Sequence, residues 1–549
     1  MTNELTKTQK VFTMLGALLG LLLAALDQTI VATAGPRIQK DLHIEPALYV
    51  WITTAYLVAS TVLVPIYGKL SDLYGRRRIL LAAIIIFLAG SAACGISRSS
   101  TQLIAFRAIQ GAGSAGLFTS AFAVVADLFP PAERGKWQGM FGAAFGLSSV
   151  VGPLLGGFIT DNFGWHWVFY VNVPIGVVAI SFILSHMPPL RPDLAHRPRL
   201  DIAGALALAV AALPVLLALS LGHAEGLGTN GWPWMSWQIF ALFGTSLVGA
   251  IAFVAIEARA ESPIIDLRLF RIKTVAVGSA AAFVIGGSFL GAIVFLPLFM
   301  VNVVGVSATA AGLTTTPLTF GIVAANISAG QAVSRVGKYK GILLASLVVQ
   351  CAAFVILALT LSPESTRAHV SLEMILLGLG LGPSIPLFTL AIQTAVPVQE
   401  IGIATAAATF FRQMGGTIGI AIVGTIFATS FAASLQRDMP PDARAQMAKH
   451  QGAGGEGDPR VAFDARAIEA RADKDIDASP MPAAAKTAAK AQAHANIEKV
   501  GRVFKVAFTD ALVRAFWVSL AIAALGLLLT AFLPALPLRA GPKPTAAAE

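Results

Sequence analysis

Long apolar runs alternate with short polar loops along almost the whole chain. A helix of about 20 apolar residues is long enough to cross a bilayer. The runs are continuous rather than alternating in polarity, which excludes a membrane β-barrel. We therefore predict an all-α integral membrane protein with fourteen membrane helices, at about 11–34, 48–68, 79–97, 101–127, 138–160, 165–187, 201–221, 236–257, 274–300, 308–333, 341–361, 372–396, 402–432 and 510–535.

The composition agrees with this prediction. Of the 549 residues, 56% are hydrophobic and only 12% are charged, whereas soluble proteins carry roughly 25% charged residues. The net charge of +10 comes from basic residues in the short loops, so it reports membrane topology and does not indicate nucleic-acid binding. Cys94 and Cys351 lie inside apolar runs. No disulfide framework, metal site or cofactor is therefore expected.

Lysine and arginine mark the cytoplasmic loops of membrane proteins. With the N-terminus inside, most of these residues fall in inner loops, and the short outer loops hold only Arg37, Lys40, Arg98 and Arg367. This asymmetry predicts a multi-pass protein of the cytoplasmic (inner) membrane with both termini in the cytoplasm. The first run is longer than the apolar core of a signal peptide, so we predict that it is retained as a span.

A short charged hairpin occurs twice, at 68–78 and again, more weakly, at 330–340. The copies join spans two to three and ten to eleven, so two six-helix halves are separated by an extra pair of spans. Such internal pseudo-symmetry is typical of transporters. The predicted units are an N-terminal six-helix bundle at 1–187, two linking helices with their loops at 188–273, a C-terminal six-helix bundle at 274–535, and a cytoplasmic tail at 536–549. The matching residues are Gly68 and Gly330, Gly75 and Gly337, Arg76 and Lys338, and Arg78 and Lys340.

The first hairpin is a candidate gate. A carboxylate at a helix end can accept charge-assisted hydrogen bonds and cap a neighbouring helix N-terminus. Asp72 beside three arginines could thus latch one side of the protein and release it in another conformation. The alternative is that the arginines only anchor the topology. The gating residues would be Gly68, Asp72, Gly75, Arg76, Arg77 and Arg78.

Three charged residues lie deep within predicted spans, away from the span ends. An arginine in hydrocarbon costs at least about 2.5–3.5 kcal/mol, so Arg107 should face the protein interior, with Gln110 one turn away on the same face. Asp27 is the one acid deep within a long apolar run, and a buried carboxyl group can exchange a proton. Its alternatives are a structural hydrogen bond or an ion pair with Arg107 or Arg412. Candidates for the lining of a cavity are Gln28, Gln110, Arg412 and Gln413.

A glycine-rich run in the fifth span follows these residues. Pro153 removes a backbone hydrogen bond and permits a bend, and the glycines offer a smooth surface for a helix that rocks against another. Static packing would need the same residues. The run comprises Gly146, Gly152, Pro153, Gly156 and Gly157.

The polar segment 433–508 is predicted to face the outside. It contains a Gly-rich stretch at 452–459 and an Ala-rich run at 483–497 that favours a helix. It is either a solvated loop or a docking surface for a periplasmic partner.

Taken together, these motifs resemble the fourteen-span drug:proton antiporters of the major facilitator superfamily, the EmrB/QacA type. The resemblance rests on Leu26-Asp27-Gln28-Thr29-Ile30-Val31 with Pro36, the hairpin 68–78, Arg107 with Gln110 and Gly111, Gly152-Pro153 with Gly156-Gly157, and Asn172-Val173-Pro174-Ile175-Gly176. It covers nearly the whole chain except 433–508.

The resemblance implies two six-helix bundles around a central cavity, alternating access, and export of small amphiphiles driven by inward protons. Asp27 and Arg107 would then serve proton coupling, and Asp72 would serve the gate. In a cell with two membranes, the outer segment 433–508 would also favour a periplasmic adaptor and an outer-membrane channel as partners.

The chain departs from the family pattern at two positions. Ser334 replaces the acid expected in the second hairpin, and His166 replaces an arginine, where packing is favoured over titration. The tenth span has no acid. Because one acid, Asp27, stands beside two arginines, Arg107 and Arg412, we expect the protein to transport neutral or anionic amphiphiles better than dications.

Two other functions fit parts of the pattern. One is dedicated export of a single metabolite, lipid or siderophore, and the other is a non-transporting sensor or scaffold, which would not need a buried acid. No phosphate-binding Gly-x-x-x-x-Gly-Lys-Ser/Thr loop and no convergent catalytic set are present. An ATP-driven pump and an enzyme are therefore not expected.

Overall fold

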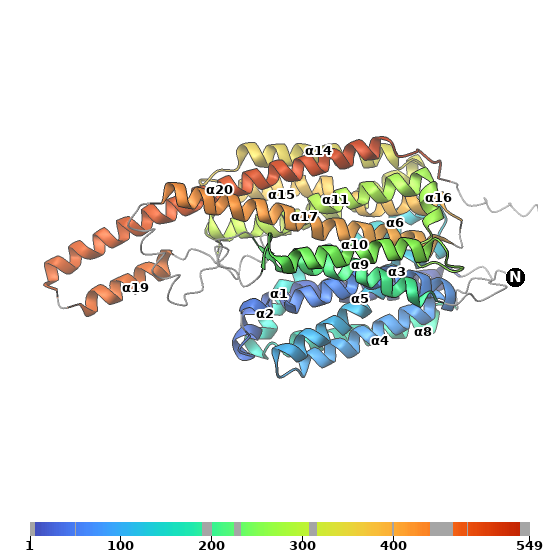
Figure 1. Ribbon diagram of the computed structural model, residues 1–549, viewed down its shortest axis with the longest axis horizontal. Helices are drawn as coiled ribbons and strands as arrows, with labels where there is room; N and C mark the ends of the chain where they lie inside the picture. Colours follow the sequence, from blue (N-terminus) through green and yellow to red (C-terminus); the bar gives the residue numbers. More distant parts are fainter. Residues whose placement is uncertain are drawn as a thin grey trace, which may run out of the picture.

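The fold was analysed in a computed structural model that describes residues 6–44, 46–49, 51–188, 200–223, 232–306, 316–397, 400–439, 465–479 and 481–538. Its long helices run roughly parallel in one bundle (Figure 1). The first half of the bundle starts with a capping box, in which Thr6 Oγ1 accepts from the Gln9 N–H at 3.2 Å and the Gln9 side chain accepts from the Thr6 N–H at 3.1 Å. This half comprises α1 (Lys7–Asp41), α2 (Pro46–Tyr49), α3 (Trp51–Tyr74), α4 (Arg76–Gly95), α5 (Ser100–Leu128), α6 (Pro131–Asn162), α7 (Trp167–Tyr170) and α8 (Asn172–His186).

The second half packs beside the first. The predicted twelfth span is interrupted at Gly382-Pro383, which divides it into α15 and α16, because a proline disrupts the helical hydrogen-bond ladder. The second half comprises α11 (Lys273–Asn302), α13 (Thr316–Val336), α14 (Lys340–Thr360), α15 (Arg367–Leu381), α16 (Ser384–Ala395), α17 (Ile401–Asp438), α19 (Ala465–Ala478) and α20 (Ala483–Ala531).

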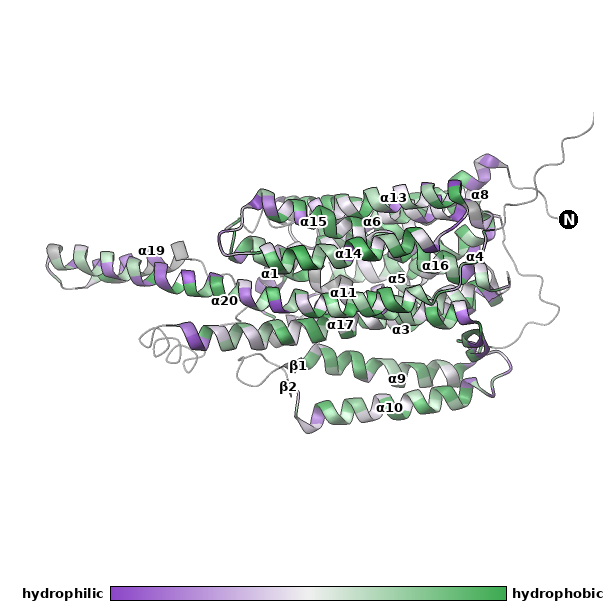
Figure 2. Cartoon of the chain, turned by 90° about the horizontal axis from the view of Figure 1, so that it is seen from above, coloured by the Kyte–Doolittle hydropathy of each residue, from purple (hydrophilic) through white to green (hydrophobic). Residues whose placement is uncertain are grey.

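An apolar helix pair links the halves. α9 (Ile202–Leu221) and α10 (Trp237–Glu257) pack on each other at the edge of the bundle and are apolar along their lengths (Figure 2). β1 (Gly222–His223) and β2 (Trp232–Pro233) form a minimal parallel pair at one end, and a 3₁₀ helix at Leu267–Arg271 leads into α11. α9 also contacts α3 and α17, so the pair touches both halves.

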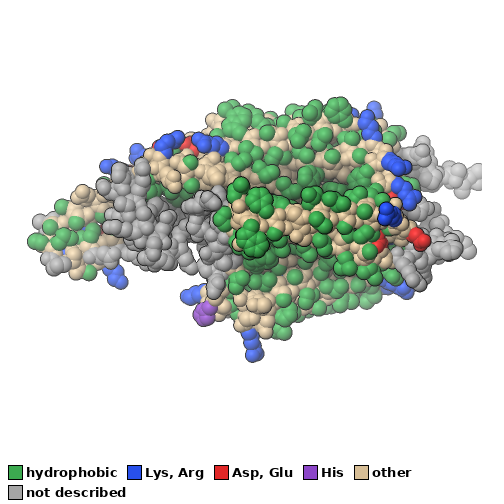
Figure 3. Space-filling model, viewed as in Figure 1, with side chains coloured by type: hydrophobic (Ala, Val, Ile, Leu, Met, Phe, Trp, Pro, Cys, Tyr) green, Lys and Arg blue, Asp and Glu red, His purple; other side chains and the backbone are tan. Residues whose placement is uncertain are grey.

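Thirteen helices in the described part of the chain are long and apolar enough to cross a membrane. The predicted span 308–333 is absent from that set. It corresponds to α13, whose 21 residues include Thr319, Asn326 and Gln331 and which packs along α6 and α15. α13 is therefore a more polar helix that packs on its neighbours along one side and exposes Phe320 and Ile327 on another. Hydrophobic side chains cover the flank of the bundle, and Lys and Arg gather near its ends (Figure 3).

The backbone of the repeated hairpin is the same in both copies. Gly75 has a φ of 92° and Gly337 a φ of 69°, a left-handed region that favours glycine. The first glycines also correspond. A Cβ at Gly68 would overlap Ala406 of α17, and a Cβ at Gly330 would overlap the Gly135 carbonyl of α6. The second helix of each half thus touches the fifth long helix of the other half.

The polar segment 433–508 contains more helix than a solvated loop would. α17 extends to Asp438, and α20 starts at Ala483, well before the predicted span at 510–535. α19 packs against α20, where Lys490 pairs with Asp477 at 2.8 Å. The two helices project beyond the bundle (Figure 1). The Gly-rich stretch 452–459 and the tail residues 539–549 lie outside the described residues.

Candidate transport site and gate

Asp27 and Arg107 form an ion pair in the interior of the first half. Arg107 Nη1 lies 2.6 Å from Asp27 Oδ2, and the side chains are 1% and 0% exposed. Arg107 therefore faces the protein interior, as predicted, and does not extend to the outer interface. Of the alternatives for Asp27, the structure contains the ion pair with Arg107.

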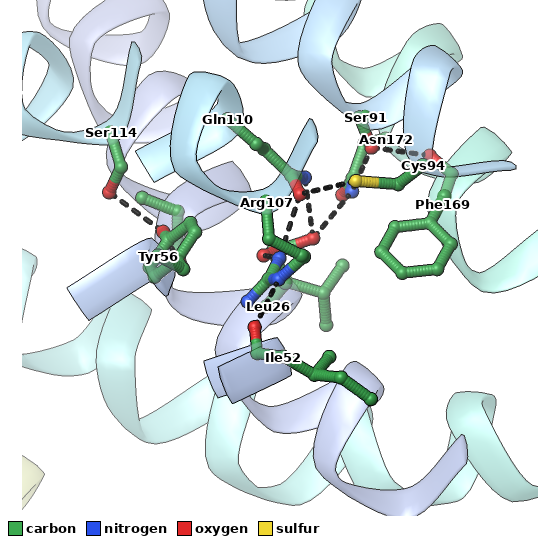
Figure 4. A network of polar contacts seen from close by, with 12 residues as sticks. Leu26, Ile52, Tyr56, Ser91, Cys94, Arg107, Gln110, Ser114, Phe169 and Asn172 are labelled. Carbon is green, nitrogen blue, oxygen red and sulfur yellow. Dashed lines mark hydrogen bonds and ion pairs between the residues drawn. The ribbon is translucent and has the colours of Figure 1, made fainter. Parts of the chain in front are cut away.

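Two neutral donors, Gln110 and Asn172, complete the environment of the Asp27 carboxylate. Figure 4 shows both close to Arg107. Gln110 Nε2 and Asn172 Nδ2 donate to Asp27 Oδ1 at 2.7 and 3.2 Å. Arg107 Nη1 also donates to Gln110 Oε1 at 2.7 Å, which fixes the orientation of that amide. One cationic and two neutral donors thus stabilise an ionised carboxylate. Arg107 and Gln110 lie on one face of α5, as their spacing predicts.

A further group of residues holds these donors. Asn172 Nδ2 donates to Ser91 Oγ at 3.0 Å, and Arg107 Nε donates to the Ile52 carbonyl at 3.0 Å. The Arg107 guanidinium lies 4.3 Å from the centre of the Tyr56 ring. Ser91 and Tyr56 were not identified from the sequence, because neutral polar residues in separate spans show no pattern that connects them.

The gating hairpin has one buried arginine that bridges two acids. Arg76 pairs with Asp72, and its Nε lies 2.8 Å from Asp127 Oδ2 at the end of α5. Arg77 donates to the Leu184 carbonyl of α8 at 2.6 Å, and Arg78 is exposed. The three arginines therefore differ in role, and Asp127 is a partner that sequence reasoning missed.

The two halves make close contacts at the end of the bundle that carries this hairpin. The Asp72 carboxylate lies against Gly402, the second residue of α17. Gln138 Nε2 of α6 donates to Gln393 Oε1 of α16 at 3.1 Å. Gly139 of α6 packs on the Asn326 backbone of α13. Asp72 thus meets the positive end of a helix that belongs to the other half.

The glycine run of α6 faces two different partners. A Cβ at Gly152 or Gly156 would overlap the Thr29 or Thr33 hydroxyl of α1, and a Cβ at Gly146 would overlap Val323 of α13. No heavy atom lies within 4 Å of a Cβ built at Gly157. Pro153 lies inside the continuous helix. α6 therefore packs on its own half at one end and on the other half at the other end.

Among the described residues, none of the remaining cavity candidates donates to Asp27 or accepts from Arg107. Gln28 and Arg412 are partly exposed, although both lie in the middle of long helices. Gln413 is also partly exposed, and its Oε1 has no hydrogen-bond partner among the described residues. Arg412 is not the counter-ion of Asp27.

The two departures from the family pattern have local explanations. Ser334 Oγ donates back to the Gly330 carbonyl at 3.0 Å. The second hairpin makes a different contact through Lys340, whose Nζ donates to the Ala531 carbonyl at the end of α20 at 2.8 Å. His166 stacks on Trp165 at 3.8 Å, and partial burial lowers the pKa of His166 while nearby Asp41 opposes the shift. The aromatic contact with Trp165 thus gives His166 a packing role.

This arrangement defines a membrane transporter, and comparison with known proteins gives its family. The Major Facilitator Superfamily model matches residues 17–420, and the chain belongs to that family. The chain is therefore a transporter and not an enzyme.

Curated relatives and a solved structure agree with this assignment. The chain is 40% identical over 458 residues to Multidrug resistance protein 3 of Bacillus subtilis, covering 83% of this chain and 86% of that protein. It is 38% identical over 426 residues to Multidrug transporter protein MdtP of the same species, covering 78% and 77%. The proton:xylose symporter XylE shares the fold at 13% identity, with a TM-score of 0.60 and 96% of each chain covered.

Proposed function

We propose that the chain exports amphiphilic drugs or toxic compounds across the cytoplasmic membrane in exchange for protons, by alternating access. Relatives at 38% and 40% identity carry the names of multidrug transport and resistance proteins. The observation that carries the proposal is Asp27, a carboxylate inside the bundle that is held by a cation and two amides. Protonation of Asp27 would remove the charge that holds Arg107 and would loosen the contacts around it.

The ion pair is closed to solvent in this conformation, with exposures of 0% and 1%. A proton must reach Asp27 through water, so the exchange requires a second conformation. We propose that the halves separate at the hairpin end when Asp72 leaves α17 and that this end faces the cytoplasm. The contacts at Gly402 and Gln393 support a conformation that is closed at that end.

The test is substrate efflux from vesicles under an imposed pH gradient, with Asp27→Asn beside the wild type. Asn keeps the shape of the side chain but cannot change charge. We expect gradient-driven flux to be lost, while thermal unfolding shows a folded variant. Gradient-driven export by Asp27→Asn at the wild-type rate would remove Asp27 from the mechanism.

We also propose that the hairpin of α19 and α20 is the docking surface for a periplasmic adaptor, which in turn would contact an outer-membrane channel. α20 has 49 residues, and only about 20 are needed to span the hydrocarbon core. The helix therefore continues well outside the membrane, and α19 packs on the extended part. A paired helical surface at a distance from the bilayer suits a protein partner.

A further inference from the structure

Arg412 is a cation near the middle of the bundle, and it has no partner among the residues that the structure describes. It follows the first residue of α17 by eleven positions, which is about 17 Å along a helix and roughly half the thickness of the hydrocarbon core. The backbone is fixed there, because a Cβ at Gly286 of α11 would overlap the Arg412 carbonyl. The start of the side chain therefore has a defined position.

The buried arginines elsewhere in the described residues all have acceptors. Arg76 and Arg107 pair with carboxylates, and Arg134 donates to the carbonyls of Phe129 and Ala126, both at 2.9 Å. Among the residues that the structure describes, Arg412 has neither an ion pair nor a hydrogen bond. It is also partly exposed, which the other three are not. A membrane-embedded cation of this kind faces water or a ligand in a cavity.

Asp27 is not available to pair with Arg412 or with a cationic substrate. Both oxygens of Asp27 already accept hydrogen bonds, from Arg107, Gln110 and Asn172. Asp27 and Arg107 cancel each other in charge. The positive charge of Arg412 therefore remains uncompensated in the interior.

Because no described acid neutralises Arg412, we propose that Arg412 binds the acidic head of a transported anionic amphiphile. This inference rests on the proposed export function. A guanidinium binds a carboxylate or sulfonate through two parallel hydrogen bonds. The apolar body of such a molecule would lie among the surrounding apolar helices. Arg412 is thus a specificity-determining residue for anionic over cationic substrates.

The experiment uses two probes that differ by one group. 8-Anilinonaphthalene-1-sulfonate is anionic, and N-phenyl-1-naphthylamine has the same rings without the sulfonate. Flux of each into inverted phosphatidylcholine vesicles is compared for the wild type, Arg412→Gln and Arg412→Lys. We expect Arg412→Gln to lose about ten- to hundredfold of the sulfonate flux, as for a lost charge-assisted hydrogen bond, with the neutral flux within about twofold. Arg412→Lys should retain most of the sulfonate flux.

Several results would overturn the proposal. The first is an unchanged sulfonate flux in Arg412→Gln. The second is an equal loss of the sulfonate and neutral fluxes in a folded Arg412→Gln variant. The third is a wild-type flux that is faster for a bis-quaternary ammonium amphiphile than for the sulfonate. The last comparison does not depend on the folding of any variant. Suppression of sulfonate flux by added phosphatidylglycerol would assign Arg412 to lipid headgroups instead.

Failure of the proposed function has a different signature. In that case neither probe would move in response to a pH gradient. Binding of the two probes to purified wild-type protein would then still test the role of Arg412. Equal affinity for both probes would reject it, and tighter binding of the sulfonate would support it.

Discussion

The carboxylate of Asp72 lies against Gly402, so that an acid of the first half meets the N-terminus of α17 in the second half. A Cβ at position 402 would overlap the carboxylate. The contact therefore depends on glycine as much as on the acid. It joins the halves next to Arg76, which holds Asp72 from the other side.

Gly402→Ala should loosen the hairpin end of the bundle. The added methyl group displaces Asp72 from the positive end of α17, an interaction that contributes up to about 2 kcal/mol in partly buried sites. Backbone amides at the start of α17 should then exchange hydrogen about ten- to thirtyfold faster, measured by mass spectrometry. Gly341→Ala is the control, because no heavy atom lies within 4 Å of a Cβ at that position. Equal exchange in both variants would contradict a structural role for the contact.

Neighbouring glycines in α6 should respond in opposite ways to alanine. Gly156→Ala places a methyl group against the Thr33 hydroxyl and 2.8 Å from the Ile30 carbonyl, and such overpacking costs about 1–3 kcal/mol. Gly157→Ala has free space and should stabilise the helix by up to about 1 kcal/mol. Thermal unfolding of both variants in one detergent measures the difference. If Gly156→Ala were as stable as the wild type, α6 and α1 would not be packed as described.

Two arginines of the hairpin should differ sharply in their contribution to stability. Arg76→Gln leaves Asp72 and Asp127 without their shared cation and should lower the free energy of unfolding by about 3–5 kcal/mol. Arg78→Gln removes an exposed charge and should change it by less than about 0.5 kcal/mol. Denaturant unfolding in micelles gives both values. Similar losses for the two variants would indicate that charge alone, rather than the buried bridge, matters.

A partner on the projecting hairpin should be detectable by cross-linking. A photoreactive residue at Gln492, an exposed position on the outer part of α20, should capture a periplasmic protein in cells with two membranes. The same residue at Leu247, which is 63% exposed on apolar α10, should face lipid and capture none. Capture at both positions, or at neither, would argue against docking at the α19–α20 hairpin.

Apolar runs and glycine spacing predicted much of the fold because both report directly on burial. The two hairpins share the positive φ of Gly75 and Gly337, as the repeat in the sequence indicates. Hydropathy was less informative about the bounds of the more polar helices. α13 carries polar residues among its apolar ones and is still a long helix of the bundle. α20 begins in a stretch rich in Ala and Lys, which favour helix in water, so it starts well before the apolar span.

The candidate site was predicted in its charged members and in Gln110, which lies one helical turn from Arg107. A charge in an apolar run is unusual, so Asp27 and Arg107 were evident, whereas Ser91 and Asn172 are common residue types that only tertiary packing brings together. Asp127 was missed because it ends a span and resembles an ordinary loop acid. Its pairing with Arg76 depends on how α4 and α5 pack, which spacing along the chain does not reveal.

Because α20 is one continuous helix, a movement of the second half is transmitted to its projecting end. Of its 49 residues, about 29 lie beyond the length needed to cross the hydrocarbon core, a distance of roughly 43 Å at 1.5 Å per residue. A tilt of the second half by about 10° would swing the tip by about 7 Å, if the helix moves as a rigid rod. A protein bound at the far end of α20 would therefore be displaced in each transport cycle.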